Sequence, residues 1–314
     1  MLSYVARRLL FVLLTLLLSS LVIFGVTQLL PGDVATMILG RFATPEALAR
    51  LRGELGLDRP LYVQYWDWLW RFVKGDWGTS LATGTAIQPW VMERLRNSAM
   101  LAGVGLVMSV PLAVVLGVVA AMKRDSWLDH VISVFSLALV GLPEFVTGLV
   151  FIGVLALGLK WLPASSAIEP DAGFFDALPK LILPGLTITL VMLAYVARMT
   201  RSGTIEVLKT DYIRTAYLKG LPAHEVILNH VLRNALLPTV TIIAISIGWL
   251  IGGLIVTESV FGYPGLGRLL LYSIQHRDLP LLQAVSMLVV AIYSLANLLA
   301  DVVYAYLNPR IRLS

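Results

Sequence analysis

The residues with the clearest potential for chemistry lie in one polar stretch, where the sequence HEVILNH places two histidines close together. A zinc-protease helix carries its two histidines four residues apart, so that both rings face one side. Here His224 and His230 are six residues apart, which is about 240° around a helix of 3.6 residues per turn. One helix cannot easily direct both rings at one ion, so we predict no metal site.

Other catalytic patterns are missing from the sequence as well. It contains no G-x-x-x-x-G-K-S/T loop that could cradle phosphates, no G-x-S-x-G nucleophile turn and no cysteine. We therefore predict no catalytic residue and no ATP site on this chain. An intramembrane enzyme is disfavoured for the same reason.

One acidic residue is notable because apolar residues surround it. Glu144 follows Pro143 in the middle of the run Val131–Leu159. In the middle of a bilayer a charge costs on the order of 3 kcal/mol, so this carboxylate should face a cavity or a partner. Two interpretations stay open: a residue of a translocation pathway that meets a cationic group, or a hydrogen-bonded glutamate at a helix break.

The elements that position these residues are those of a membrane protein. Of the 314 residues, 58% are hydrophobic and 14% are charged, with a mean hydropathy of +0.83, whereas a soluble domain has about 25% charged residues. A helix needs about 20 apolar residues to cross a bilayer. Six runs qualify or nearly qualify: Leu9–Leu30, Ser98–Met122, Val131–Leu159, Leu181–Ala197, Ala235–Thr257 and Leu281–Tyr306. The predicted fold class is therefore all-α integral membrane with six transmembrane helices.

The basic residues between the runs predict the orientation of the chain. One side holds twelve of them: Arg7, Arg8, Lys123, Arg124, Arg198, Arg201, Lys209, Arg214, Lys219, Arg233, Arg310 and Arg312. The short loops of the other side hold four: Lys160, Lys180, Arg268 and Arg277. This asymmetry places both termini in the cytoplasm, and it explains the excess of positive charge without a nucleic-acid partner. The first run is expected to be a retained span, because its 22 residues exceed the usual 7–15 of a signal peptide.

The long outer loop, residues 31–97, carries signals for two helices. Thr44 can cap a helix that has Pro45 in its first turn and stops at Gly56. A second helix is expected over Tyr62–Val73, where aromatic residues recur at helical spacing. A lid on the membrane surface and a docking surface both remain open.

Small and polar residues within the spans are expected to fix the packing of the helices. Gly248 and Gly252 form a weak G-x-x-x-G signal for close packing. Asn297 and Asp301 in the last span should fix packing or pair with a basic residue. Glu258 is expected at the outer surface at the end of the fifth span.

The polar segment 201–234 contains a pattern of helix, tight turn and helix. Asp211 is predicted to be the N-cap of the first helix, Gly220 to end it with a positive φ, and Pro222 to lie in the first turn of the second. The apolar side chains of Tyr212, Ile213 and Tyr217 lack an obvious partner. The segment could receive a push from a cytoplasmic partner, or it could be a solvated loop that only sets topology.

The same segment resembles the cytoplasmic coupling loop of permease subunits of binding-protein-dependent ABC importers. The general form of that loop is E-A-A-x-x-x-G, nine residues, then I-x-L-P. Its departures here resemble the dipeptide, oligopeptide and nickel branch. The residues that fit the branch are Asp211, Tyr212, Arg214, Thr215, Ala216, Lys219, Gly220, His230, Leu232, Arg233, Asn234, Ala235 and Pro238.

Motifs along nearly the whole chain are similar to the same branch. They are LPGD (Leu30–Asp33), LGLDRPLYVQY (Leu55–Tyr65), GDWGTS (Gly75–Ser80), ESVFGYPGLGRLL (Glu258–Leu270) and NPRIR (Asn308–Arg312). Each is weak alone, and their shared order gives the resemblance its strength.

The resemblance implies a type I importer permease, a single transmembrane domain over residues 1–314 in the bacterial inner membrane. It implies a second related permease chain, two cytoplasmic ATPases that hold the ATP and Mg²⁺, and a periplasmic or lipid-anchored solute-binding protein. The residues expected to couple to an ATPase are Asp211, Tyr212, Arg214, Thr215, Ala216, Lys219, Gly220, His230 and Arg233. Peptides are the expected solute, with nickel chelates, glutathione, opines and sugars as alternatives. A secondary transporter is disfavoured, because Glu144 and Asp301 lie at different depths and form no charge relay.

Overall fold

The computed structural model describes residues 2–29, 34–39, 43–169 and 173–307, and these residues are mostly helical. The helical form follows from the apolar runs, because inside a bilayer a helix satisfies its own backbone hydrogen bonds. The helices are α1 (Leu2–Leu29), α2 (Val34–Leu39), α3 (Pro45–Leu55), α4 (Leu61–Lys74), α5 (Ile87–Met122), α6 (Trp127–Gly141), α7 (Glu144–Phe151), the π-helix η1 (Ile152–Gly158), α8 (Phe174–Leu208), α9 (Asp211–Leu218), α10 (Ala223–Glu225), the π-helix η2 (Val226–Val231), α11 (Leu232–Phe261), α12 (Leu266–Gln275) and α13 (Leu279–Leu307). The motifs LPGD and NPRIR lie outside the described residues.

The number of membrane-crossing helices agrees with the prediction. Within the described residues, five helices are long and apolar enough to cross a bilayer, or six if the bent pair α6–α7 forms one span. The limits of some spans differ from those predicted: α8 has 35 residues, around an apolar run of only 17, and α5 begins at Ile87, inside the predicted outer loop.

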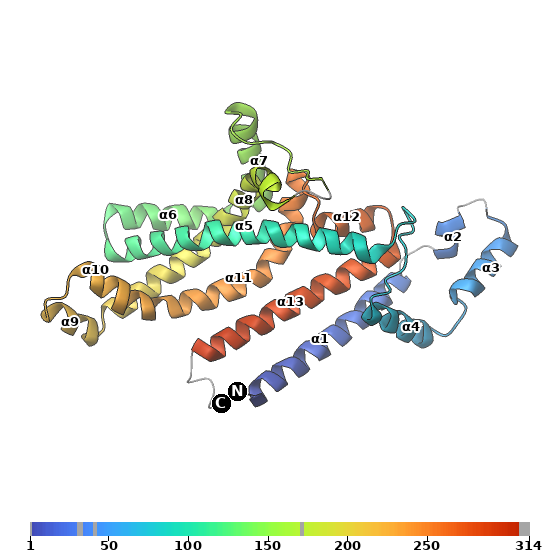
Figure 1. Cartoon of the computed structure of the whole chain (residues 1–314), viewed down its shortest axis with the longest axis horizontal. Coiled ribbons are helices and arrows are strands. Elements are labelled where there is room, and N and C mark those ends of the chain that lie inside the picture. Colours follow the sequence, from blue (N-terminus) through green and yellow to red (C-terminus); the bar gives the residue numbers. More distant parts are fainter. Residues whose placement is uncertain (1, 30–33, 40–42, 170–172, 308–314) are drawn as a thin grey trace.

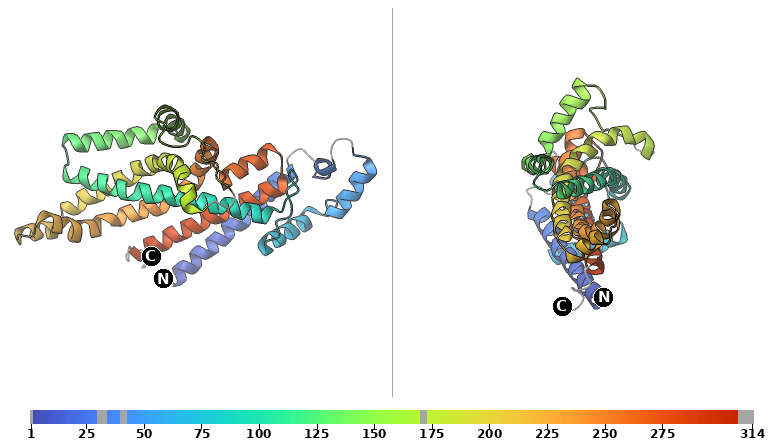
Figure 2. Two further views of the ribbon diagram at one scale, coloured as in Figure 1. Left: turned by 45° about the horizontal axis from the view of Figure 1, so that its top comes forward. Right: turned by 90° about the vertical axis from the view of Figure 1, so that its left-hand side faces the viewer.

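The third span is not one straight helix. The chain bends by 106° between α6 and the pair α7–η1. Leu142 is extended, with φ −87° and ψ 124°, because a residue that precedes proline avoids the helical region. The bend at Pro143 turns α7 and η1 out of the bundle, as Figures 1 and 2 show, and it places Glu144 at the start of α7.

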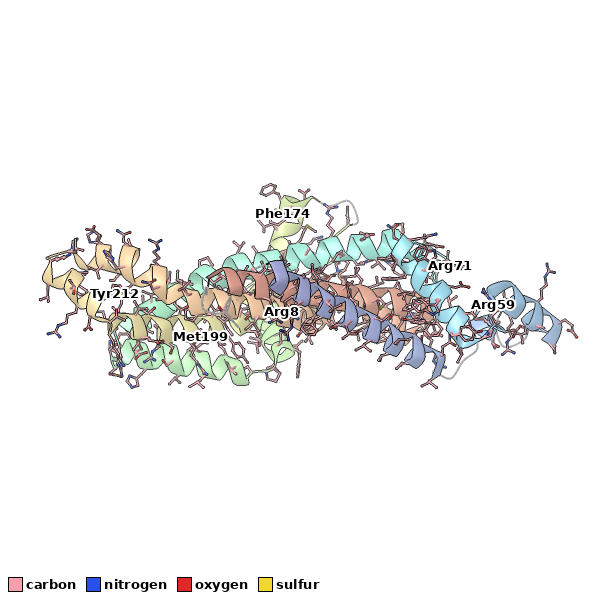
Figure 3. All side chains as sticks on the ribbon, turned by 90° about the horizontal axis from the view of Figure 1, so that it is seen from below. Arg8, Arg59, Arg71, Phe174, Met199 and Tyr212 are labelled. Carbon is pink, nitrogen blue, oxygen red and sulfur yellow. The ribbon has the colours of Figure 1, made fainter. Side chains whose placement is uncertain are left out.

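The bundle is elongated, and its two ends carry different elements (Figure 1). Helices α5, α8 and α11 form the centre, where Leu101, Leu181, Ile188 and Leu250 pack in one buried cluster. Helices α9 and α10 lie at one end, and α2 to α4 lie at the other (Figures 1 and 2). In Figure 3, Tyr212 therefore lies far from Arg59 and Arg71 along the long axis.

Helices α1 and α13 pack against each other beside the central helices. The start of α1 and the end of α13 lie close together in Figure 1. Arg8 of α1 pairs with Asp301 of α13 at 2.7 Å, which confirms the expectation that Asp301 meets a basic residue.

The two helices predicted in the outer loop are confirmed. The hydroxyl of Thr44 accepts from the amide of Ala47 at the start of α3, and Gly56 ends that helix with φ +68°. Helix α4 packs on α1 through Tyr65, whose hydroxyl lies 2.8 Å from that of Ser20. Trp66 and Trp70 remain more than half exposed, so one face of α4 is covered and another is open.

The α11–α12 corner shows that the expectation for Glu258 was wrong. Its side chain is fully buried and lies against the first turn of α12. One carboxylate oxygen accepts from the hydroxyl of Ser98 and the other from the amide of Arg268, at 3.0 Å. The Ser98 hydroxyl itself accepts from the amide of Leu266 at 2.8 Å. Glu258 and Ser98 together cap α12, because the amides of the first helical turn have no partner within the helix.

A second buried carboxylate fastens the GDWGTS motif to α13. Asp278 is fully buried and accepts from the hydroxyl of Ser80 and the amide of Leu281. This motif therefore joins the outer loop to the start of the last span.

Candidate coupling and pathway sites

Helix α9 begins one residue away from its predicted cap. Thr210 takes the N-cap position, with extended backbone angles of φ −77° and ψ 148°, and Asp211 lies in the first turn. The Thr210 hydroxyl donates to the carbonyl of Val207 at 2.6 Å, so it does not cap the helix. The carboxylate of Asp211 still lies near the positive end of the helix dipole.

The end of α9 agrees with the prediction for Gly220, whose φ is +79°. The amide of Gly220 donates to the carbonyl of Tyr217 at 3.0 Å, and the amide of Leu221 donates to that of Ala216 at 3.4 Å. These two bonds form a Schellman motif, in which glycine is favoured because it adopts the left-handed conformation without steric cost.

The inner face of α9 is packed, which corrects the expectation that Ile213 has no partner. Ile213 and Ala216 are buried in a cluster with Val226, Val231 and Ala235. Pro222 immediately precedes α10 and is not inside its first turn. From Ala223 onwards the chain stays helical through η2 into α11, so α9 rests on a direct extension of a membrane-spanning helix.

The outer face of α9 is open and carries charged residues beside the exposed side chains of Tyr212, Tyr217 and Leu218. We call this face the α9 surface. The predicted coupling residues that are exposed on it or beside it are Asp211, Tyr212, Arg214, Thr215, Lys219, Gly220 and Arg233. His230 is half-buried and Ala216 is buried, so Ala216 contributes to the packing of α9 and not to its exposed face. The side-chain amide of Asn234 donates to the hydroxyl of Tyr212 at 2.8 Å. This bond joins the two halves of the segment.

Glu144, the other predicted site residue, lies on the wall of a cavity far from α9. The cavity has a volume of about 260 Å³. It is bounded by α7, α8 and α11 through Glu144, Ile188, Val191, Met192, Tyr195, Ser246, Leu250 and Gly253. This position agrees with the expectation that the carboxylate faces a cavity or a partner, and it also fits the interpretation as a hydrogen-bonded glutamate at a helix break.

Two residues of α11 hold the Glu144 carboxylate in place. The hydroxyl of Thr257 donates to one of its oxygens. The other oxygen lies against Gly253, where a Cβ atom would come within 2.8 Å of it. A larger residue at position 253 would therefore displace the carboxylate. Among the described residues, no basic side chain forms an ion pair with Glu144.

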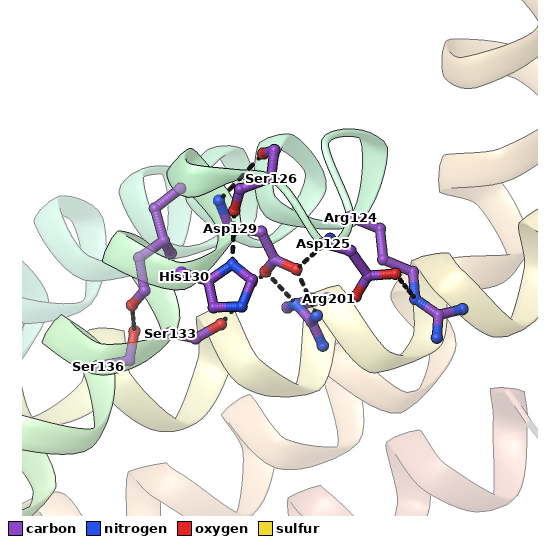
Figure 4. Close-up of polar contacts among 9 residues, drawn as sticks. Arg124, Asp125, Ser126, Asp129, His130, Ser133, Ser136 and Arg201 are labelled. Atoms are coloured by element: carbon purple, nitrogen blue, oxygen red, sulfur yellow. Dashed lines mark hydrogen bonds and ion pairs between the residues drawn. The ribbon is translucent and has the colours of Figure 1, made fainter.

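An ion pair that the sequence did not predict joins α6 to α8, with a buried Asp129 and a partly exposed Arg201. The guanidinium of Arg201 donates to both oxygens of Asp129, each at 2.6 Å (Figure 4). The Asp129 carboxylate also accepts from the amide of Asp125 and the hydroxyl of Ser133. Its side chain is 4% exposed. In the sequence Arg201 could be read only as one of the basic residues that indicate orientation.

Sequence reasoning also missed the partners of Glu144. Thr257 is 113 residues away along the chain, and the residues that line the cavity belong to three helices. Gly253 directly follows the G-x-x-x-G pair in the sequence, and no pattern there indicated its contact with Glu144. Of that pair, Gly248 packs closely, because a Cβ atom there would lie 3.1 Å from the ring of Tyr293 on α13. A Cβ atom at Gly252 would meet no other described element within 4 Å.

Comparison with known families covers the whole chain. Residues 113–313 match the model of the binding-protein-dependent transport system inner membrane component. Residues 1–115 match the model of the N-terminal part of the membrane component of the same systems. The chain belongs to this family, and it is a multi-pass protein of the inner membrane.

Individual relatives agree with this assignment. The chain is 37% identical over 309 residues to a probable peptide ABC transporter permease, y4tP of Sinorhizobium fredii, covering 98% of this chain and 99% of the relative. It is 38% identical over 312 residues to the glutathione transport system permease GsiC of Escherichia coli K12, covering 99% of both chains. Among solved structures, an amino acid ABC transporter matches with a TM-score of 0.53 and 16% identity, over 69% of this chain and 94% of that one. The last match shows a shared fold.

Proposed function

We propose that this chain forms half of the solute pathway of an ATP-driven importer for peptides or similar small solutes. The other half is a second, related permease chain, and heterodimer formation is expected. Two cytoplasmic ATPase subunits bind and hydrolyse ATP with Mg²⁺, and a periplasmic or lipid-anchored binding protein delivers the solute. Peptides are supported by the named functions of the relatives, since glutathione is itself a tripeptide.

The observation that carries the coupling proposal is the α9 surface. Helix α9 has a packed inner face and an exposed outer face with charged and aromatic residues, and it rests on the helical extension of α11. A rigid element of this kind can transmit movement from a protein bound at its surface to a membrane-spanning helix. The proposed contacts with the ATPase are made by the exposed coupling residues, while Ala216 and Gly220 keep α9 in place.

The proposed pathway residue is Glu144. Its carboxylate borders the cavity between α7, α8 and α11, which are central or adjacent to the centre of the bundle. In this proposal α9 and both termini are on the cytoplasmic side of the membrane, and α2 to α4 are on the periplasmic side.

Purification of the tagged chain from its native host tests the assembly. We expect two ATPase chains and a second permease to be identified by mass spectrometry in the same complex. In proteoliposomes this complex should take up solute only with MgATP and loaded binding protein. Uptake by the chain alone, driven by an ion gradient, would contradict the proposal and support a secondary transporter. Mass spectrometry of the small molecules that co-purify with the binding protein would separate peptides from nickel chelates, opines and sugars.

A further inference from the structure

The cavity beside Glu144 has the properties of a site for part of a cationic solute. Its described walls are mostly apolar, formed by Ile188, Val191, Met192 and Leu250, with Tyr195 and Ser246 as neutral polar groups. Glu144 is the charged residue among them. Its volume of about 260 Å³ is below the range of about 300–1,000 Å³ that holds a whole drug-sized ligand. The space therefore suits one charged group with an adjoining side chain.

The carboxylate of Glu144 is oriented but retains capacity to accept hydrogen bonds. Thr257 donates one bond to it, whereas an ionised carboxylate can accept about four. The second oxygen lies beside Gly253 without an ion pair from any described basic residue. A half-buried carboxylate in this condition is stabilised by a positively charged partner.

The chemistry of the cavity selects an ammonium group over a metal ion. A calcium ion takes 6–8 oxygen ligands and magnesium about six in octahedral geometry, and no group of three metal-binding side chains occurs in the part of the chain that the structure describes. An ammonium group needs only a few acceptors.

We propose that this cavity is a subsite for cations, in which Glu144 binds an ammonium group of the transported solute and the apolar walls receive the adjoining side chain. The inference rests on the proposed function, because it assumes that the cavity belongs to the solute pathway. It adds a selection for solutes with a free amino group, made within the membrane and separately from the binding protein. Thr257 and Gly253 act as positioning residues, which keep the carboxylate turned towards the cavity.

Cysteine labelling tests the subsite without knowledge of the natural solute. The chain has no cysteine of its own, so Ser246→Cys places one thiol in the cavity at little cost in size. The importer complex with this change is reconstituted in nanodiscs, which are open on both sides. The thiol is then treated with two methanethiosulfonate reagents of similar size, one carrying trimethylammonium and the other sulfonate. Thr241→Cys, on the same helix but outside the cavity lining, is the matched control.

We expect the cationic reagent to react with Ser246→Cys at least about tenfold faster than the anionic reagent, because opposite charges attract strongly at low dielectric. Adding Glu144→Gln should bring the ratio near that of Thr241→Cys. An unchanged ratio after Glu144→Gln is added would overturn the subsite. A reactivity ratio near that of Thr241→Cys, in Ser246→Cys both with and without Glu144→Gln, would also overturn it. That result is expected if a basic residue of the second permease already neutralises Glu144. Failure of both reagents in every nucleotide state would also overturn it.

A transport measurement then tests the solute class. Proteoliposomes with the binding protein are supplied with an apolar dipeptide or with its N-acetylated form, using concentrations that saturate the binding protein. Loss of one charge-assisted hydrogen bond in Glu144→Gln should lower uptake of the free dipeptide about tenfold and leave the acetylated form unchanged. An equal effect on both peptides would contradict ammonium recognition. ATP-driven uptake by the parent complex in the same vesicles would still support the importer function, so the two failures are distinguishable.

Discussion

At the scale of single residues, the functional segments depend on a few positions where no other side chain fits equally well. Gly220 is needed because α9 ends in a left-handed conformation with φ +79°, and Asp129 is needed because it compensates a guanidinium between two helices. Gly220 is exposed beside the α9 surface but acts through its backbone conformation, and Asp129 belongs to α6 and not to that surface. Their replacement should therefore affect geometry or stability before it affects any contact with a partner.

Replacement of Gly220 tests the geometry of α9. A β-branched residue at this φ is strained by about 1–3 kcal/mol, so Gly220→Val should tilt or unwind α9. The apolar residues of the spans are unchanged, and we expect normal abundance in the membrane. Solute uptake should be lost, and ATP hydrolysis should no longer respond to loaded binding protein. The measurement is stimulated ATPase activity in proteoliposomes. Wild-type stimulation in this variant would show that the shape of α9 is not needed for coupling.

Replacement of Asp129 tests the ion pair with Arg201. Asp129→Asn leaves the Arg201 guanidinium without its counter-charge, which costs about 3–5 kcal/mol in a fully buried pair and less here, because Arg201 is partly exposed to solvent. We expect a lower melting temperature of the purified complex and reduced abundance in the membrane. The double change Asp129→Leu with Arg201→Met should recover part of the stability, because apolar replacement of both partners is often neutral. A double variant less stable than the single one would contradict this explanation.

At the scale of elements, the sequence predicted local features well. The start of α3 was predicted from Thr44, its end from Gly56, and the end of α9 from Gly220. These predictions succeed because helix capping depends on residues only a few positions apart. The error at the start of α9 is also local, because the N-cap is Thr210 and not the neighbouring Asp211. The bend at Pro143 could be foreseen as a helix break, but its direction could not, because it depends on packing against α8 and α11.

The side-chain contacts that the sequence did not predict all join residues far apart in the chain. Glu258 meets Ser98 across 160 positions of the chain, and Asp129 meets Arg201 across 72. Hydropathy predicted that Glu258 lies at the exposed end of a span. The hydropathy of one helix does not show which other element of the chain covers that end. The cavity beside Glu144 could not be predicted for the same reason.

The α12 cap gives a prediction for an element as a whole. Glu258→Ala removes the acceptor for the Arg268 amide and leaves the Ser98 hydroxyl without its partner. Loss of a cap costs about 0.5–2 kcal/mol, and each buried polar group left unpaired adds about 1–3 kcal/mol. We therefore expect a clear loss of thermal stability, with a smaller loss for Glu258→Gln, which keeps one acceptor. Melting of the purified complex measures both. Equal stability of Glu258→Ala and wild type would show that the α12 cap is not needed.

The α9 surface gives a second prediction for an element, by reversal of charge. Arg214 is exposed on α9, so Arg214→Glu should leave the fold intact and weaken the attachment of an ATPase. We expect less ATPase in the affinity-purified complex, with normal abundance of the permease. Lys160→Glu, in the loop after η1, is the control and should leave ATPase retention unchanged. Full retention by Arg214→Glu would indicate that this segment sets topology only.

At the scale of the whole molecule, the arrangement separates two tasks along one axis. The α9 surface lies at one end, the outer-loop helices lie at the other, and Arg8, which pairs with Asp301, lies between them (Figures 1 and 3). The Glu144 cavity lies between them, bordered by α11, which is also continuous with the support of α9. A movement imposed on α9 can therefore reach the wall of the cavity through one continuous helical element, and such a bistable arrangement is what an ATP-driven importer requires.

This arrangement requires that the two ends lie on opposite sides of the membrane, which single cysteines can test in a chain without native ones. Thr83, Ser165 and Ser202 are exposed, the first two in loops and the third near the end of α8 from which the chain continues into α9. In spheroplasts, Thr83→Cys and Ser165→Cys should react with an impermeant maleimide, because their loops belong to the proposed periplasmic end. Ser202→Cys should react only after the membrane is permeabilised, since the asymmetry of basic residues places it inside. Labelling of Ser202→Cys in intact spheroplasts would reverse the orientation and remove the α9 surface from the reach of a cytoplasmic ATPase.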